Sequence, residues 1–125
     1  MSRRISLVLM SILLVALLGS ACAQSPVGSQ EQGQQMAEEF VKMEATYRFD
    51  GIPETLDLTI TTSVARGWKY TIEFDSRYTG YGNRTGKILA QVITHHTAVV
   101  TVQSGRVTSA IMDNKWDMIK SQQIG

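Results

Sequence analysis

The spacing of hydrophobic residues changes partway along the chain, and this change restricts the folds open to it. In the first segment the hydrophobic residues recur at steps of four, three and four, at Met36, Phe40, Met43 and Tyr47. Such steps place side chains on one face of an α-helix. From Leu56 onward apolar and polar residues alternate, which is the period of a strand with one buried face. We therefore expect one amphipathic helix followed by a set of strands.

Alternation predicts half-buried strands at 56–61 and 68–75. Two apolar runs, at 99–102 and 107–111, are predicted to form a further pair of strands. Residues 87–94 fit both a helix face and a strand, and the β-branched residues near their end favour a strand. The predicted sheet therefore has about four to five strands.

The pair Ser104-Gly105 separates two of these runs and suits a two-residue hairpin turn. The length of a hairpin loop determines the register of the strands that it joins. The predicted cross-strand pairs are Val102 with Val107, Ala98 with Ile111, and Thr101 with Thr108.

These elements predict an α+β domain of two layers, with one N-terminal helix packed on an antiparallel sheet. The helix is expected to end near Thr46, because Asp50-Gly51 and Pro53 interrupt the pattern after it. In the tail, Trp116 together with Met118 or Ile119 is expected to close over the sheet.

The first 21 residues have the three parts of an export signal. Arg3 and Arg4 precede an apolar run at 5–18, which small residues follow. The run is shorter than the roughly 20 apolar residues that a membrane-crossing helix needs. We therefore interpret residues 1–21 as a signal peptide.

Cys22 is the only cysteine of the chain. The segment Leu18-Gly19-Ser20-Ala21-Cys22 resembles the lipobox of prokaryotic lipoproteins, which implies lipid attachment at Cys22 and an extracytoplasmic, membrane-anchored location. Gly19 stands where that pattern most often has leucine. Two alternatives stay open, which are cleavage after Ala23 to release a soluble secreted protein, and an uncleaved anchor.

Residues 22–35 are rich in Gln, Ser and Gly, a composition that predicts a flexible tether after the lipidated cysteine. Residues 36–125 are then long enough for a single domain. The chain has 12 Lys and Arg against 11 Asp and Glu, and loss of Arg3 and Arg4 with the signal peptide leaves it nearly neutral. Because nucleic acids are bound through concentrated positive charge, we expect no nucleic acid partner.

Residues 78–86 have the most unusual composition, with three glycines, two tyrosines and an arginine. They do not form a Walker phosphate loop, because Ile88 follows Gly86-Lys87 where Ser or Thr is required, and they do not fit the dinucleotide-binding fingerprint. One interpretation is a connection in which glycines adopt positive φ. The other is a loop that presents its polar and aromatic side chains to a ligand or protein partner, through Tyr81, Asn83 and Arg84.

Asn83-Arg84-Thr85 is also a glycosylation sequon, which we expect to be unoccupied. His95-His96 are weak candidates for a metal site, because neighbouring residues on a strand point to opposite faces and further ligands are not evident. We expect surface or turn histidines. No nucleophile motif is present, and no metal, cofactor or catalytic residue is predicted.

Four segments together resemble a group of small prokaryotic exported lipoproteins of unknown function, over most of the mature chain. They are Phe49-Asp50-Gly51-Ile52, Gly80-Tyr81-Gly82-Asn83-Arg84-Thr85-Gly86, Leu89-Ala90-Gln91-Val92-Ile93-Thr94 and Lys115-Trp116-Asp117-Met118. The resemblance implies export and brings no activity. The order of elements is also similar to cystatin-like and PepSY-like modules, in architecture only.

The sequence therefore predicts a non-enzymatic binding module of the cell envelope, whose partner is an envelope protein or a small molecule. Three alternatives stay open. The protein is soluble and secreted, or it is a weak metal-dependent or hydrolytic enzyme that uses His95 or His96 with a carboxylate, or it is a purely structural or inhibitory surface module that acts through an exposed strand edge.

Overall fold

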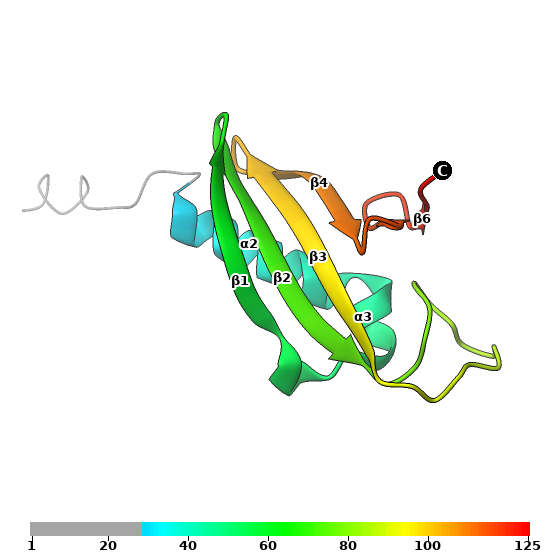
Figure 1. Cartoon of the computed structure of the whole chain (residues 1–125). Helices are drawn as coiled ribbons and strands as arrows, with labels where there is room; N and C mark the ends of the chain where they lie inside the picture. The colour runs from blue at the N-terminus through cyan, green and yellow to red at the C-terminus, as the bar shows by residue number, and fades with distance from the viewer. Residues whose placement is uncertain (1–28) are drawn as a thin grey trace, which may run out of the picture.

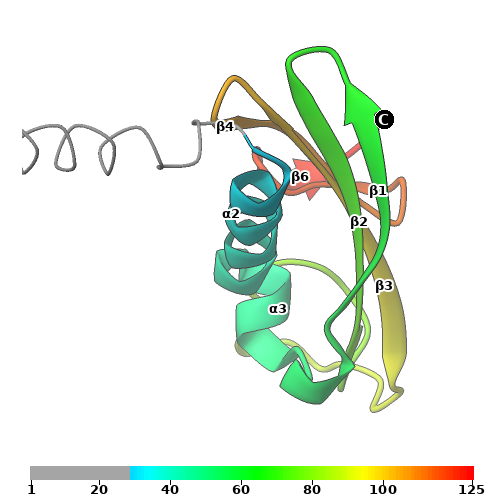
Figure 2. The same ribbon diagram turned by 90° about the vertical axis from the view of Figure 1, so that its left-hand side faces the viewer.

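The computed structural model describes residues 29–125, so the predicted signal peptide and Cys22 lie outside the described residues. One sheet and the helices on one of its faces form two layers (Figures 1 and 2). The helical elements are α2 (Gln30–Met43), α3 (Ala45–Asp50) and the short 3-10 helix η1 (Pro53–Thr55). The strands are β1 (Asp57–Val64), β2 (Gly67–Ser76), β3 (Thr94–Gln103), β4 (Arg106–Met112), β5 (Trp116–Asp117) and β6 (Gln122–Gln123).

The sheet is an antiparallel meander in the order β1-β2-β3-β4-β5-β6. The predicted α+β class, with a helix packed on an antiparallel sheet, is confirmed. The sheet has six strands rather than four to five, because the tail folds into two additional two-residue strands, β5 and β6. No helix among residues 29–125 is long and apolar enough to cross a membrane.

Helix α2 begins earlier than predicted, within the stretch interpreted as a tether. The side chain of Ser29 caps it by accepting a hydrogen bond from the Gln32 amide at 3.3 Å. Its buried face consists of Gly33, Ala37 and Val41. These small side chains let the helix approach the sheet closely, and the Tyr70 hydroxyl reaches the Gln30 carbonyl at 2.6 Å.

The predicted face of Met36, Phe40, Met43 and Tyr47 is therefore only partly correct. Three of these residues pack against the core at its margin, whereas Met43 is 71% exposed. The reason is a break at Glu44, which leaves the helical conformation and caps α3 by accepting from the Thr46 amide at 2.9 Å. The predicted single helix is thus two helices in different orientations, as Figure 2 shows.

The core lies between the helices and the central strands. The alternation predicted for β2 is confirmed, since Tyr70, Ile72 and Phe74 are fully buried. Facing residues of β3, β4 and the tail complete the core: Ala98, Val100, Val102, Ala110, Met112 and Met118. In the tail, Trp116 and Met118 pack as expected, whereas Ile119 is half exposed.

Irregular pairing changes the direction of several side chains. In β1 the register shifts between Leu58 and Ile60, so Leu58 pairs with buried Ile72 while Ile60 pairs with Thr71 on the open face of the sheet. A β-bulge of this kind reverses the alternation that follows it. The prediction that Ile60 shares a face with Leu58 is therefore wrong, and Ile60 is 57% exposed.

A second bulge affects the hairpin of β3 and β4. The predicted pair of Val102 with Val107 is confirmed. A register shift between Thr101 and Val102 then pairs Ala98 with Met112 and Thr101 with Ser109, so the other two predicted pairs are wrong. The strand predicted at 87–94 is also absent, since β3 begins at Thr94 and residues 87–93 have no regular structure.

Candidate functional site

The connection between β2 and β3, residues 77–93, is the longest segment without regular structure in the described chain. Its first part, 78–86, folds back onto the domain, and its second part, 87–93, projects beyond the end of the sheet (Figure 1). We call residues 87–93 the arm. Three glycines allow the course of the connection, because Gly80, Gly82 and Gly86 all adopt positive φ, as one interpretation predicted.

Arg84 anchors the connection from inside. Only 2% of its side chain is exposed, and its Nη2 lies 2.8 Å from the carboxylate of Asp50, which is itself buried. The guanidinium also donates to the carbonyl oxygens of Gly82, Thr79 and Thr46, each at 3.0 Å, and lies over the ring of Phe49. Arg84 therefore holds the loop in place and is not presented to a partner.

Tyr81 has a similar role on the other side of the connection. Its ring stacks on that of Trp116, with centroids 5.6 Å apart, and its hydroxyl donates to Asp113 at 2.9 Å. Burial, together with the hydrogen bond and the charge of Asp113, raises the pKa of Tyr81 to about 12. Of the three predicted contact residues only Asn83 is exposed, and its side-chain oxygen accepts from the amide and hydroxyl of Thr85.

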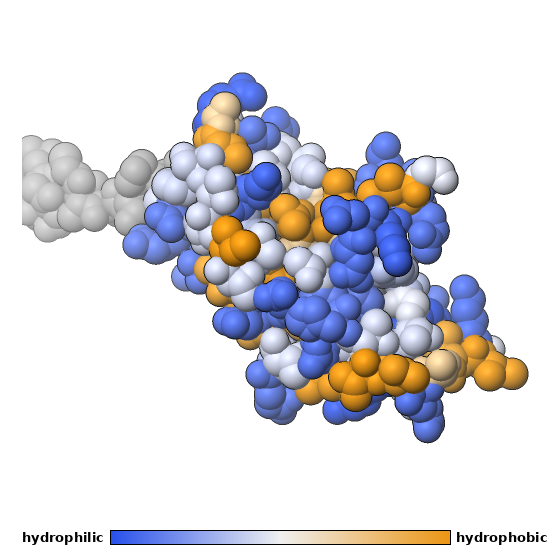
Figure 3. All heavy atoms as spheres, viewed as in Figure 1, coloured by the Kyte–Doolittle hydropathy of each residue, from blue (hydrophilic) through white to orange (hydrophobic). Residues whose placement is uncertain are grey.

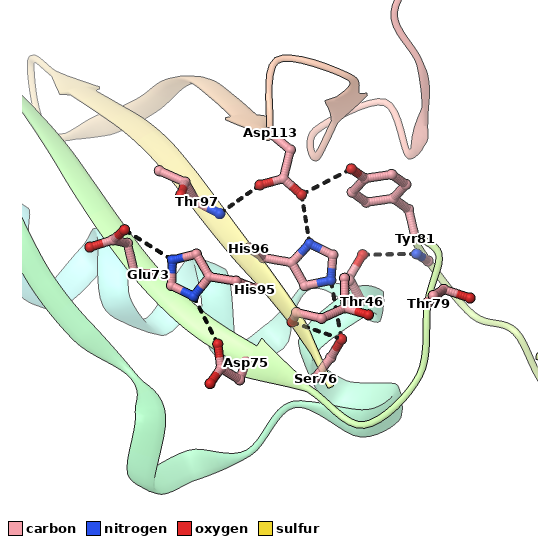
Figure 4. Close-up of polar contacts among 12 residues, drawn as sticks. Thr46, Glu73, Asp75, Ser76, Thr79, Tyr81, His95, His96, Thr97 and Asp113 are labelled. Carbon is pink, nitrogen blue, oxygen red and sulfur yellow. Dashed lines mark hydrogen bonds and ion pairs between the residues drawn. The ribbon is translucent and has the colours of Figure 1, made fainter. Parts of the chain in front are cut away.

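Figure 4 shows that His96 lies inside the domain, between Asp113 and Ser76. Its Nδ1 is 2.7 Å from Asp113, which can only accept when ionised, so Nδ1 carries the hydrogen. Its Nε2 is 3.2 Å from the Ser76 hydroxyl. The prediction of a surface or turn histidine is wrong for His96, which is 1% exposed.

The order serine, histidine, carboxylate is that of hydrolase triads, but the surroundings here do not support catalysis. Ser76 is fully buried, so a substrate cannot reach its oxygen. The hydroxyl also lies 2.9 Å from the Tyr78 carbonyl, to which it can only donate. The network instead joins the ends of β2 and β3 to the turn before β5.

Asp113 is the centre of this network. Burial alone raises the pKa of its carboxyl, but hydrogen bonds from His96, from the Thr97 amide and from Tyr81 outweigh that effect and lower the net pKa. Asp113 is therefore a stable anion that holds β3, the connection and the β4–β5 turn together. Sequence reasoning missed this role, because its partners are distant along the chain.

His95 points to the opposite face, as predicted, and is exposed. Its two ring nitrogens lie 2.8 Å from Asp75 and 3.0 Å from Glu73, on the neighbouring strand (Figure 4). The hydrogen bonds to Glu73 and Asp75 raise the pKa of His95. Within residues 29–125 no group of three or more potential ligands is placed to hold a metal ion.

A hollow of about 760 Å³ lies between the connection and the C-terminal tail. Its walls include Tyr81, Lys87 and Leu89 from the connection, and Trp116 and Gln123 from the tail. A smaller hollow of about 330 Å³ is lined by Asn83 and Thr85 together with residues of α3. Both hollows are open to solvent, and Ala45 and Asn83 line both of them.

The arm carries three of the seven large hydrophobic residues that are exposed in the described chain. Ile88 is fully exposed, and Val92 and Ile93 are 55% and 61% exposed. The arm accounts for apolar surface at the lower right of Figure 3. Its backbone is also poorly paired, since within residues 29–125 the amides of residues 88–91 and of Ile93 donate to no other residue.

The arm was not recognised from the sequence as a contact site, although its composition contained the signal. Four large aliphatic residues, Ile88, Leu89, Val92 and Ile93, occur between 88 and 93 without the clear period of a helix or strand. Comparison with known proteins adds no relative, because no protein-family model, curated protein or solved structure matches this chain.

Proposed function

We propose that this chain is a non-enzymatic binding module, held at the extracytoplasmic face of a membrane by a lipid on Cys22, which binds an envelope protein through the arm. The observation that carries the proposal is the exposure of Ile88, Val92 and Ile93 on one short segment. Single exposed apolar residues are common on protein surfaces, whereas a contiguous group of this kind usually marks an interaction site.

The anchored part of the connection prepares the arm for binding. Arg84 and Gly82 bond to α3, at Asp50 and Thr46, and Tyr81 bonds to Asp113 in the turn between β4 and β5. These bonds hold the base of the arm against the domain. Binding by a preorganised segment loses less conformational entropy than binding by a free loop.

The chemistry of the arm fits a protein partner that supplies a strand edge. The arm is apolar, rich in β-branched residues at Val92 and Ile93, and the amides of residues 88–91 and of Ile93 are unpaired within residues 29–125. A segment with these properties can add to the edge of a sheet, where main-chain hydrogen bonds give affinity and alternate side chains give specificity.

The position of the arm fits the predicted anchor. The described chain begins at Ser29, beside the first turn of α2, and the arm lies at the opposite end of the domain (Figures 1 and 2). A lipid attached at Cys22 would therefore leave the arm facing away from the anchored end.

The experiment is photo-crosslinking in intact cells of the source organism. A photoreactive amino acid is placed at position 88 on the arm, or at position 43 as the control, because Met43 is equally apolar and 71% exposed on α2. We expect a discrete adduct with an envelope protein from position 88 that is lost in the Val92→Asp background. The same adducts from positions 88 and 43 would contradict the proposal.

A further inference from the structure

Strand β1 is an edge of the sheet with little protection against pairing. It lies at one end of the strand order, and its segment 58–64 contains no charged residue and no proline. Edge strands are usually protected by lysine, by proline or by a covering segment. The bulge near Leu58 does not hide the edge, since it turns Ile60 outward to 57% exposure.

The arm complements this edge, because its apolar and β-branched sequence suits a strand, whereas residues 87–93 belong to no strand of their own sheet. It cannot pair with β1 of its own molecule, since it runs into β3 and β2 lies between β3 and β1. In Figure 1 the arm projects from the side of the sheet opposite to β1. A partner for either feature must therefore come from another molecule.

The two segments are similar in length and complementary in charge. Strand β1 has eight residues, and the arm, 87–93, has seven. Each contains a single charged residue, at its first position, and the signs are opposite, with Asp57 in β1 and Lys87 in the arm. Parallel pairing therefore places Lys87 beside Asp57, a favourable cross-strand pair, and places Ile60 beside Ala90.

We propose that the envelope protein bound by the arm is a second copy of this chain, and that the arm adds in parallel to its β1 edge. This inference rests on the proposed function and names the partner. The arm of one copy binds the β1 edge of the next, so the contact joins two different surfaces and is heterologous. In a pair of copies, the first keeps a free β1 edge and the second keeps a free arm. Copies on one membrane therefore assemble head to tail.

Mixing two defective variants tests the contact. The arm variant carries Ile88→Asp and Val92→Asp, and keeps an intact edge. The edge variant carries Ile60→Lys, and keeps an intact arm. Sedimentation of the full acylated protein in detergent is expected to show growth with concentration for wild type, monomers for each variant alone, and a one-to-one dimer for the mixture.

Met43→Asp is the matched control, since it places the same charge on another exposed apolar site, and it is expected to assemble like wild type. Charge reversal gives a second test that leaves the hydrophobic residues unchanged. Lys87→Asp and Asp57→Lys should each weaken assembly a few-fold when alone, and their mixture should restore it, because each arm then finds an edge of opposite charge.

A monomeric wild type, or a mixture of arm and edge variants that stays monomeric, would overturn the inference. In that case an adduct from position 88 with a different envelope protein would still support the proposed function. If position 88 gives no adduct, either with a second copy or with another protein, both the proposed function and this inference are rejected.

Discussion

Arg84 illustrates how strongly the surroundings of a residue determine its role. An arginine among glycines is typical of an exposed binding loop, and the sequence offered no reason to place it inside. Its partner Asp50 is 34 residues away along the chain, at the end of α3. The buried pair is therefore a property of the folded chain, and local composition could not predict it.

The free energy of unfolding should depend strongly on this pair. Arg84→Met leaves the carboxylate of Asp50 buried without its partner, and loss of one member of a buried ion pair costs about 3–5 kcal/mol. Urea denaturation measures the change. Arg77→Met, at an exposed arginine of the same connection, should change stability by less than about 0.5 kcal/mol. If Arg84→Met were equally mild, the anchoring role would be wrong. Adding Asp50→Leu should recover part of the loss.

His95 should make stability depend on pH. Hydrogen bonds to Glu73 and Asp75 raise the pKa of His95 in the folded chain. The contribution of His95 to the free energy of unfolding is therefore fully present below the pKa of an unfolded histidine, which is roughly 6.5. It is lost as the pH rises through the higher pKa of the folded chain. NMR titration of the ring should show a raised pKa that Glu73→Gln lowers. Glu39→Gln, on the exposed face of α2, should leave it unchanged. An ordinary pKa in wild type would refute the contact.

At the scale of elements, the sequence was most informative where hydrophobic spacing depends on one segment alone. Strand β2 and the fold class could be predicted, because alternation in β2 directly reports its buried face. The bulge that turns Ile60 outward could not, because it belongs to the pairing of two strands. The arm was mistaken for a strand for the same reason, since a strand needs an edge to pair with.

The close approach of α2 to the sheet leads to an element-scale prediction. Gly33→Ala would normally favour a helix by about 1 kcal/mol. Here a Cβ on Gly33 would overlap the Tyr70 hydroxyl, which donates to the Gln30 carbonyl. We expect net destabilisation by about 1–3 kcal/mol in thermal or urea unfolding, as for other overpacked contacts. Gln35→Ala, at an exposed position of the same helix, should be neutral or stabilising. A stabilised Gly33→Ala would show that the contact is loose.

At the scale of the whole molecule, the domain has two distinct ends. Helix α2 begins at one end, and the arm leaves the sheet at the other (Figure 1). The open face of the sheet between them carries the hydrogen-bonded group of Glu73, Asp75 and His95. If the lipid is attached at Cys22, the arm and the anchor lie at opposite ends of the sheet. A substitution can then remove the anchor and leave the arm unchanged.

Cys22→Ala therefore tests the anchor without changing the domain. We expect the wild-type protein in the membrane fraction, with a mass increased by acyl chains, and the variant in the soluble extracytoplasmic fraction. The physical reason is that two or more acyl chains anchor a protein stably, each buried methylene contributing about 0.8 kcal/mol, whereas residues 29–125 contain no membrane-spanning helix. The control is Ser25→Ala, three residues further along the same segment. If cleavage instead follows Ala23, wild type and Cys22→Ala will both be soluble with an unmodified chain starting at Gln24, and the arm will act from a secreted protein.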